Sequence, residues 1–279
     1  MSTTESLATK NTSAAEAAKK FVADGYCILP SILPEDLIRR TVDGMDAVMR
    51  CEYETGLTPL DAWWSPNDPP TKIRKIDQAH ISNRAIFEAV TQPALGELVA
   101  TVTGARMVQV WAVQLLHKPA GGDAKGAVGW HQDYFYWKNW WTPESNVFTA
   151  WLALSDVREE CGPMHFAAGS QRWGLLDASD FFGVADEKQR NGIPIPPGET
   201  WREESGAMPP GAFSIHHRLT FHGSQPNLSK IPRYSFAIHL RTENSTPTPQ
   251  GALNPTDKHS YDYVGHLDDE SICPVIYLA

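Results

Sequence analysis

The chain has 279 residues, of which 42% are hydrophobic and 20% charged, and it carries a formal net charge of -9. This length and composition are typical of a globular protein with a sizeable core, and no apolar run approaches the roughly 20 residues of a membrane span. An acidic balance without a Lys/Arg cluster argues against nucleic-acid or anionic-membrane partners, and four scattered cysteines without a CxxC pair indicate reduced thiols in a cytoplasmic protein.

Helices are predicted in the first part of the chain. Residues 1–14 are polar and small, so we expect a disordered tail there, without the apolar stretch of a secretion signal. Apolar residues at helical spacing, bounded by glycine or proline, then predict three helices and one short strand. In chain order these are a helix from Ala14 that ends at Gly25, a strand over 26–29, a helix beginning at Pro34, and a helix over 84–103. The Pro- and Trp-rich residues 53–72 read as an irregular loop.

Strands are predicted in the rest of the chain. Apolar runs separated by Gly/Pro-rich turns indicate strands over 107–118, 147–154, 212–216 and 234–240. Helices followed by strands are typical of an α+β chain whose strand-rich part closes as a sandwich or barrel. We therefore expect a single domain over residues 15–279. Residues 243–279 read as an irregular C-terminal extension that could form a lid or a partner contact and that includes Tyr261, Tyr263 and His266.

The central chemical signal is the sequence Trp130-His131-Gln132-Asp133. On an extended segment, residues i and i+2 point to the same face, so His131 and Asp133 can offer a nitrogen and an oxygen to one ion. Two histidines and one carboxylate form the facial triad of non-haem iron oxygenases. The tripeptide alone is a weak signal, because a second one occurs at His266-Leu267-Asp268.

Residues 211–240 supply the candidates for a third ligand, which are His216, His217 and His222. His222 is followed by Gly-Ser and, eleven residues on, by Arg233. Arg233 and Ser235 alternate along a predicted strand, so both can point inward. A guanidinium matches a carboxylate bidentately, and a serine hydroxyl can add a third hydrogen bond. The alternative for Arg233 is a surface position on that strand.

Taken in order, these pieces resemble the phytanoyl-CoA dioxygenase family of iron(II)/2-oxoglutarate oxygenases. The resemblance covers roughly residues 18–242 and includes a strand with a central tryptophan, a Gly-Pro turn and a Gly-Ser turn between the two histidine motifs. The matching segments are His131-Gln132-Asp133, Ala150–Asp156 around Trp151, Cys161-Gly162-Pro163-Met164, Ala168-Gly169-Ser170, and His222-Gly223-Ser224 through Asn227, Ser229 and Arg233.

The resemblance implies a mainly β core, a double-stranded β-helix (cupin-like jelly roll), with flanking N-terminal helices. It implies iron(II) bound by His131, Asp133 and His222, with 2-oxoglutarate and O₂ as co-substrates and ascorbate as a possible aid. It places Arg233 and Ser235 at the distal carboxylate of 2-oxoglutarate. The further co-substrate positions are Gln132, Trp151 and, across a variable region, Lys75; Gln114 is an additional pocket candidate.

Two departures from the family pattern stand out. The chain has Gly211-Ala212 where the family usually has Gly-Asp, and Met164-His165 where many members have an apolar or aromatic residue. Neither touches the implied metal set. The carboxylate of Asp133 favours oxygenation, because related halogenases carry a small residue at that position.

Aromatic residues crowd the metal motif between Trp130 and Trp141. We expect a mixture of pocket walls and core packing, with Tyr134 and Trp137 lying nearest the site and contacting substrate. The expected reaction is hydroxylation of an unactivated C–H bond in a mostly apolar small molecule, such as one of secondary metabolism, with desaturation or epimerisation as branches. The absence of a basic cluster weakens the case for a coenzyme A thioester.

Three alternatives and one open question remain at this point. The chain could be a non-catalytic jelly-roll binding protein, a zinc hydrolase using His217 and His222, or a structural interaction protein. The sequence leaves the oligomeric state open.

Overall fold

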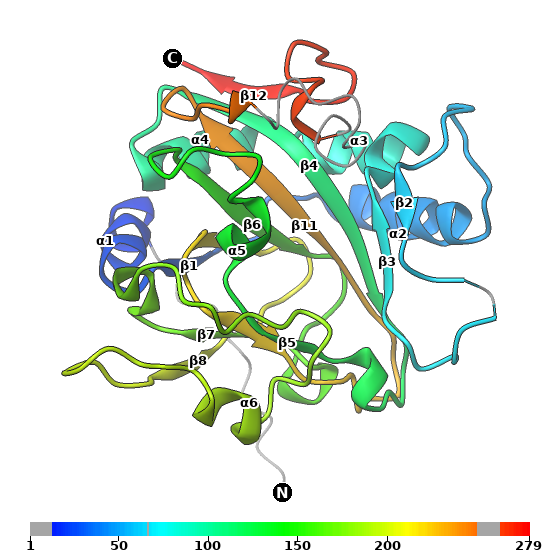
Figure 1. The fold of residues 1–279 in the computed structure, drawn as a ribbon. Coiled ribbons are helices and arrows are strands. Elements are labelled where there is room, and N and C mark those ends of the chain that lie inside the picture. Colours follow the sequence, from blue (N-terminus) through cyan, green and yellow to red (C-terminus); the bar gives the residue numbers. More distant parts are fainter. Residues whose placement is uncertain (1–12, 66, 250–262) are drawn as a thin grey trace, which may run out of the picture.

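The structure is a computed structural model that describes residues 13–65, 67–249 and 263–279. Residues 1–12 of the expected tail, and Tyr261 of the C-terminal extension, lie outside this part of the chain. Two antiparallel sheets pack face to face, and helices cover the outer side of the larger one (Figure 1). None of the described helices is long and apolar enough to cross a membrane.

The larger sheet has eight strands, and every pair in it is antiparallel. Along the sheet the strands are β1 (Tyr26–Leu29), β9 (Phe213–His217), β6 (Val147–Ala153), β11 (Arg233–Thr242), β4 (Met107–Lys118), β3 (Arg74–Asp77) and β2 (Asp61–Ala62), with β12 (Val275–Leu278) also paired to β4. The smaller sheet consists of β5 (Val128–His131), β10 (His222–Ser224), β7 (Met164–Ala167) and β8 (Glu203–Ser205). This arrangement is the expected jelly roll.

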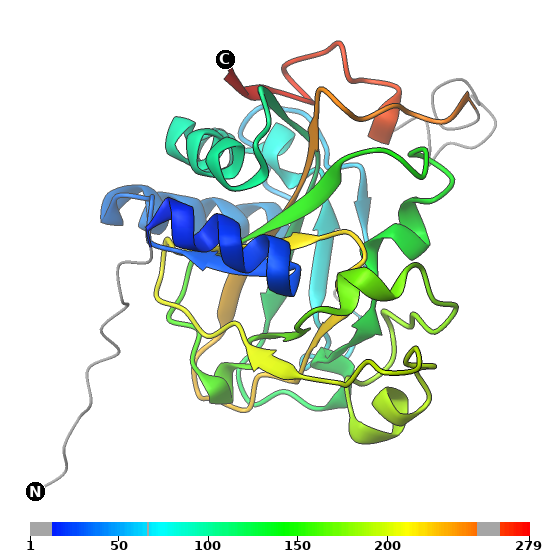
Figure 2. The ribbon, with the colours of Figure 1, turned by 90° about the vertical axis from the view of Figure 1, so that its left-hand side faces the viewer.

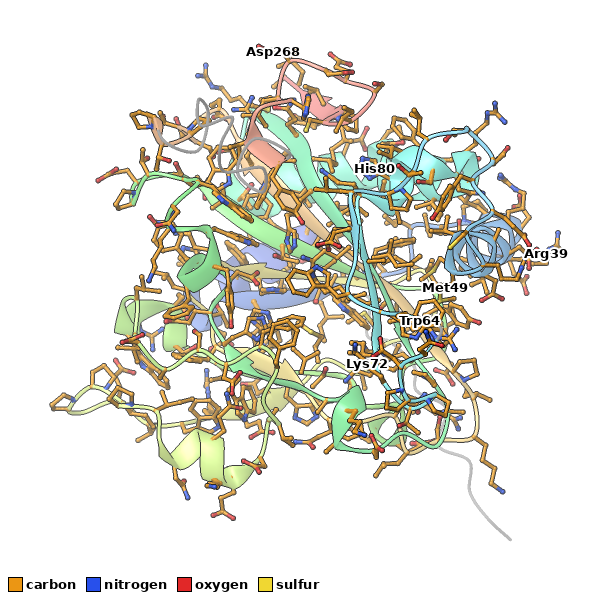
Figure 3. All side chains as sticks on the ribbon, turned by 45° about the vertical axis from the view of Figure 1, so that its right-hand side comes forward. Arg39, Met49, Trp64, Lys72, His80 and Asp268 are labelled. Atoms are coloured by element: carbon orange, nitrogen blue, oxygen red, sulfur yellow. The ribbon has the colours of Figure 1, made fainter. Side chains whose placement is uncertain are left out.

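Helices form a layer on one side of the larger sheet, as the rotated view in Figure 2 shows for α1, α2 and α4. The α-helices are α1 (Ala14–Asp24), α2 (Glu35–Met49), α3 (Arg84–Val90), α4 (Pro93–Thr103), α5 (Asp133–Trp137) and α6 (Glu187–Asn191). Short 3-10 turns occur at Ala79–Ser82, Ala124–Gly126, Glu159–Cys161 and Ser170–Trp173. The outer face of α2 meets solvent, where Arg39 projects from the molecule (Figure 3).

Local chemistry explains the helix boundaries. Ser13 and Glu16 form a capping box at the start of α1, and Gly25 ends that helix in the left-handed conformation, with φ 77°. The single helix predicted over 84–103 is two helices. Pro93 begins the second one, and Gln92 before it is extended, with ψ 127°. A residue that precedes proline is disfavoured in the helical region, so the first helix ends there.

Two apolar clusters hold these layers together. The first fills the space between the helices and the outer face of the larger sheet and includes Leu95, Val110 and Ile238. The second lies between the two sheets, where Tyr26 of β1 stacks on Phe166 of β7 with ring centroids 4.2 Å apart. Burial of apolar surface from both sheets therefore fixes the position of the smaller sheet over the larger one.

The C-terminal residues contribute a regular strand, which the sequence pattern did not indicate. Strand β12 pairs with the first residues of β4 and packs against α4. Gly96 in α4 makes this approach possible, because a Cβ at this position would overlap the Ile276 carbonyl. The same terminal segment brings the buried Tyr263 hydroxyl to Asp77, at 2.8 Å.

Replacing Gly96 with alanine should separate β12 from α4. Alanine is the better helix former by about 1 kcal/mol, but the clash with the Ile276 carbonyl costs about 1–3 kcal/mol in overpacking. We expect the melting temperature to fall by several degrees in calorimetry. Glu97→Ala, at an exposed position of the same helix, is the control and should change it little. An unchanged or raised melting temperature in Gly96→Ala would contradict this packing.

Candidate metal centre

The pairing of β5 with β10 brings the predicted metal ligands together. His131 ends β5, and His222 opens β10 directly opposite it in the register. His131 Nε2 lies 3.7 Å and His222 Nε2 3.6 Å from Asp133 Oδ1. All three side chains are buried, and their ligand atoms lie within 4.8 Å of one another. Two nitrogens and one oxygen thus surround a point that one metal ion could occupy.

The backbone fixes which nitrogen of each imidazole faces this point. His131 Nδ1 lies 2.8 Å from the Gly129 carbonyl, and His222 Nδ1 lies 3.0 Å from the Thr220 carbonyl. A carbonyl only accepts, so each Nδ1 carries the proton and each Nε2 presents a lone pair. Burial, together with the imidazoles of His131 and His216, holds the pKa of His222 well below its usual range. The ring is therefore neutral, as metal binding requires.

The Asp133 carboxylate is held through its second oxygen. Oδ2 accepts a hydrogen bond from Thr149 Oγ1 at 2.7 Å and lies 3.3 Å from His216 Nε2. Burial by itself would raise the pKa of Asp133, but the imidazoles of His222, His131 and His216 hold it well below its usual range. The carboxylate is ionised, and Oδ1 is left to face the two histidines.

The three histidines of residues 211–240 have different surroundings. His222 belongs to the cluster, whereas His216 contacts Asp133 on the side away from the other two ligands. His217 lies outside the cluster, and its Nδ1 accepts a hydrogen bond from the Leu219 amide at 3.1 Å. Burial lowers the pKa of His217 to about 4. A metal site made by His217 with His222 is not what the described residues form.

The metal motif itself turns from strand to helix. The prediction placed His131 and Asp133 on one extended segment, but Asp133 is the first residue of α5. Gln132 between them is extended, with ψ 128°, so the two side chains still share a face. The side-chain amide of Gln132 donates through Nε2 to the carbonyls of Gly174 and Leu219, at 2.8 and 2.7 Å.

A cavity next to the metal cluster contains Arg233. It is lined by His131, Asp133, Trp151, His222, Ser224 and Arg233, among others. Arg233 is 2% exposed, and its guanidinium lies 5.1 Å from the centre of the Trp151 ring. One Nη donates to the Gly162 carbonyl, while Nε has no hydrogen-bond partner. Burial lowers the pKa of Arg233 to about 9.

A second buried cation, Lys118, lies beside Arg233, and the sequence did not single it out. The two residues face each other across β4 and β11. Lys118 is fully buried, and its ammonium donates to Ser224 Oγ at 2.6 Å and to the Gln225 carbonyl at 2.5 Å. Burial and the charge of Arg233 hold its pKa well below its usual range. Among the described residues, no carboxylate forms an ion pair with either cation.

The other predicted co-substrate residues lie in three different places. Trp151 and Gln114 line the Arg233 cavity. Ser235 Oγ donates to the Leu116 carbonyl at 3.1 Å, and neither Ser235 nor Gln132 is among the residues that line the cavity. Lys75 lies elsewhere, in a second and larger cavity, where it forms an ion pair with Asp77 at 2.8 Å.

The larger cavity has a volume of about 250 Å³ and borders the metal cluster at His131 and Asp133. Its walls are mostly aromatic, and include Trp63, Trp111, Tyr136, Trp137, Trp140 and Phe181. Five residues line both cavities: Gln114, His131, Asp133, Phe181 and His239. A small molecule in the larger one would therefore meet the metal and a molecule in the smaller one.

Helical spacing decides which aromatic residues reach this cavity. Asp133, Tyr136, Trp137 and Trp140 follow one another at i, i+3, i+4 and i+7, which places them on one side of α5 and its continuation. Tyr134 is not among the lining residues; its hydroxyl donates to the Trp141 carbonyl at 3.1 Å. Trp137 and Tyr136 thus line the cavity, Tyr134 does not, and contact of Trp137 with a substrate stays a prediction.

Known proteins share both the sequence pattern and the fold. The model of the family named Phytanoyl-CoA dioxygenase (PhyH) matches residues 21–235. A bovine (Bos taurus) protein, phytanoyl-CoA dioxygenase domain-containing protein 1, is 29% identical over 288 residues, which cover 85% of this chain and 94% of the bovine protein.

Two solved structures illustrate the likeness in fold. The epimerase SnoN in complex with Fe3+, alpha ketoglutarate and nogalamycin RO superposes with a TM-score of 0.68 at 21% identity, over 88% of this chain and 91% of that one. EctD from S. alaskensis with 2-oxoglutarate and 5-hydroxyectoine gives a TM-score of 0.62 at 18% identity, over 85% and 79%.

The family model spans most of the chain, and the jelly roll and the buried His-Asp-His cluster agree with it. The chain belongs to the phytanoyl-CoA dioxygenase family, and the expected class of iron(II)/2-oxoglutarate-dependent oxygenase is confirmed with it.

Proposed function

We propose that His131 Nε2, Asp133 Oδ1 and His222 Nε2 bind the iron, that Arg233 binds the distal carboxylate of 2-oxoglutarate, and that the enzyme hydroxylates a C–H bond of a mostly apolar small molecule. One observation carries the metal assignment. The hydrogen bonds from both Nδ1 atoms and to Asp133 Oδ2 leave three free ligand atoms that converge. Two neutral nitrogens and one carboxylate oxygen on one side of the ion are the donor set that non-haem iron(II) oxygenases use.

The charge balance supports 2-oxoglutarate in the Arg233 cavity. A buried cation without an anion is unfavourable, and two of them lie side by side here. The Nε atom of Arg233 has no protein partner, and the cavity is also lined by a tryptophan ring and by all three proposed metal ligands. A dicarboxylate that reaches from the metal to Arg233 would supply the missing negative charge, so the residues present fit this co-substrate.

The residues of the chain have separate tasks in this account. Iron(II) with 2-oxoglutarate and O₂ supplies the oxidant that attacks the C–H bond. Thr149 and His216 hold Asp133 so that only Oδ1 faces the ion. Lys118 of β4 donates hydrogen bonds to Ser224 and Gln225, and so links the residues after His222 to β4 next to Arg233. The aromatic walls of the larger cavity exclude water and position the substrate against the metal.

Several finer expectations stay predictions. They are hydroxylation in preference to desaturation or epimerisation, the contacts of Ser235, Gln132 and Lys75 with 2-oxoglutarate, the contact of Tyr134 with substrate, the cytoplasmic location, and the lack of nucleic-acid or membrane partners. For Lys75, the ion pair with Asp77 supports a place in the substrate cavity instead.

Alanine substitutions at His222 and His216 distinguish a proposed iron ligand from a histidine that only contacts another ligand. His222→Ala removes one of three iron ligands, so we expect no stoichiometric iron(II) after anaerobic loading. His216→Ala removes only a contact to Asp133 Oδ2, so one equivalent should still bind, about tenfold to a hundredfold more weakly. Elemental analysis and metal titration measure both. The reverse result, loss of iron in His216→Ala alone, would contradict the assignment.

Arg233→Gln tests the co-substrate site without touching the metal ligands. We expect the Kd of 2-oxoglutarate to rise about a hundredfold, because a buried charged partner is lost, while iron binding remains. Arg241→Gln on the same strand is the matched control; Arg241 bonds to Gln109 at 2.5 Å and lies outside both cavities. Calorimetric titration of the iron-loaded proteins gives the Kd values. Equal Kd values for the two variants would refute the role of Arg233.

A further inference from the structure

The larger cavity has one polar corner in its aromatic wall, and Asp77 lies in that corner. Asp77 is 1% exposed and is the last residue of β3, where it pairs with Gln114 of β4. Its Oδ2 accepts three hydrogen bonds, from Lys75 Nζ at 2.8 Å, Trp63 Nε1 at 2.9 Å and Tyr263 OH at 2.8 Å. Donors from three separate segments of the chain thus fix the orientation of this carboxylate.

The other oxygen of Asp77 has no hydrogen-bond partner in the structure. A carboxylate oxygen only accepts hydrogen bonds, and a buried acceptor without a donor is unfavourable. Asp77 lines the cavity, so a bound molecule can supply this donor. Lys75 already neutralises the charge of Asp77, so a neutral donor such as a hydroxyl satisfies the site without adding a buried charge.

His239 offers a second unpaired acceptor in the same cavity. Its Nδ1 lies 2.9 Å from Thr149 Oγ1, and that hydroxyl has only one proton, which it donates to the ionised Asp133. The Thr149 oxygen must therefore accept from His239, which places the proton on Nδ1. Burial lowers the pKa of His239 to about 4, so the ring is neutral and Nε2 carries a lone pair. Nε2 has no partner.

Two tryptophans hold the His239 ring in place. The Trp111 ring stacks on it with centroids 5.4 Å apart, and the Trp137 ring meets it edge-on at 4.7 Å. Both tryptophans also line the cavity. The cavity therefore combines flat aromatic walls, two fixed acceptors that lack donors, and an opening to the metal ligands His131 and Asp133.

We propose that the substrate is a neutral, ring-containing alcohol with at least two hydroxyl groups, which donates hydrogen bonds to Asp77 Oδ1 and His239 Nε2. This inference rests on the proposed function, because it places the ring between the two acceptors and the iron site. The aromatic walls bind the faces and edges of the ring, and the two hydroxyl contacts select which C–H bond faces the metal.

A matched pair of probes tests the requirement for hydroxyl donors in the unmodified enzyme. The probes are naphthalene-1,5-diol and its dimethyl ether, which share the ring and differ in donor capacity. We expect the protein loaded with iron(II) and 2-oxoglutarate, kept free of O₂, to bind the diol at least about tenfold more tightly in calorimetry. Equal affinities, or no binding of the diol, would overturn the proposal.

Asp77→Asn replaces the unpaired acceptor with a donor and keeps the shape of the side chain. The three donors around Oδ2 require the amide oxygen at that position, so the amide NH₂ replaces the free acceptor. We expect the diol to lose about tenfold in affinity and the ether to match or exceed it. His239→Phe keeps a ring but lacks Nε2, so it should also weaken binding of the diol. A diol affinity unchanged in both variants would overturn the proposal.

The controls separate this inference from the proposed function. Asp268→Asn removes the same charge at an exposed position of the C-terminal segment, labelled in Figure 3, and should leave the affinity for the diol unchanged. Uptake of 2-oxoglutarate by the iron-loaded protein is measured first. Failure of that uptake refutes the proposed function and this inference with it. Normal uptake without preference for the diol refutes this inference alone.

Discussion

The pairing of β5 with β10 is the constraint on which the candidate site depends. It sets His131 opposite His222, and the turn into α5 then carries Asp133 between them. The backbone carbonyls of residues 129 and 220 fix both imidazoles in one tautomer. Apolar packing holds the smaller sheet over the larger one and so supports this geometry.

Two cavities meet at this cluster, and their chemistry differs. The smaller one contains Arg233, a buried cation without a carboxylate partner among the described residues, which suits a carboxylate, and Lys118 lies next to Arg233 on the neighbouring strand. The larger one is aromatic, with acceptors that lack donors, which suits a neutral alcohol. Thr149 connects the two sides, because it bonds both to Asp133 and to His239. One hydroxyl therefore contacts both the proposed iron ligand Asp133 and the proposed substrate contact His239.

The sequence predicted the jelly roll and the members of the metal cluster because they lie in one ordered set of local motifs from His131 to Arg233. Residues brought together by strand register could not be found in this way. Lys118, Asp77 and His239 lie on three different strands, and each has at least one hydrogen-bond partner far away in the sequence. Tyr134 was chosen in place of Tyr136 because the start of α5 at Asp133 was not recognised, so the helical spacing was missed.

The central claim is that iron bonds to the Nε2 atoms of His131 and His222 and to one oxygen of Asp133. Anomalous diffraction at the iron edge, from crystals grown without O₂ with iron(II) and 2-oxoglutarate, tests it most directly. The account predicts a single iron peak bonded to these two nitrogens and to Asp133 Oδ1, with 2-oxoglutarate extending to Arg233. An iron peak bonded to His216 or to Asp133 Oδ2, or 2-oxoglutarate placed away from Arg233, would contradict it.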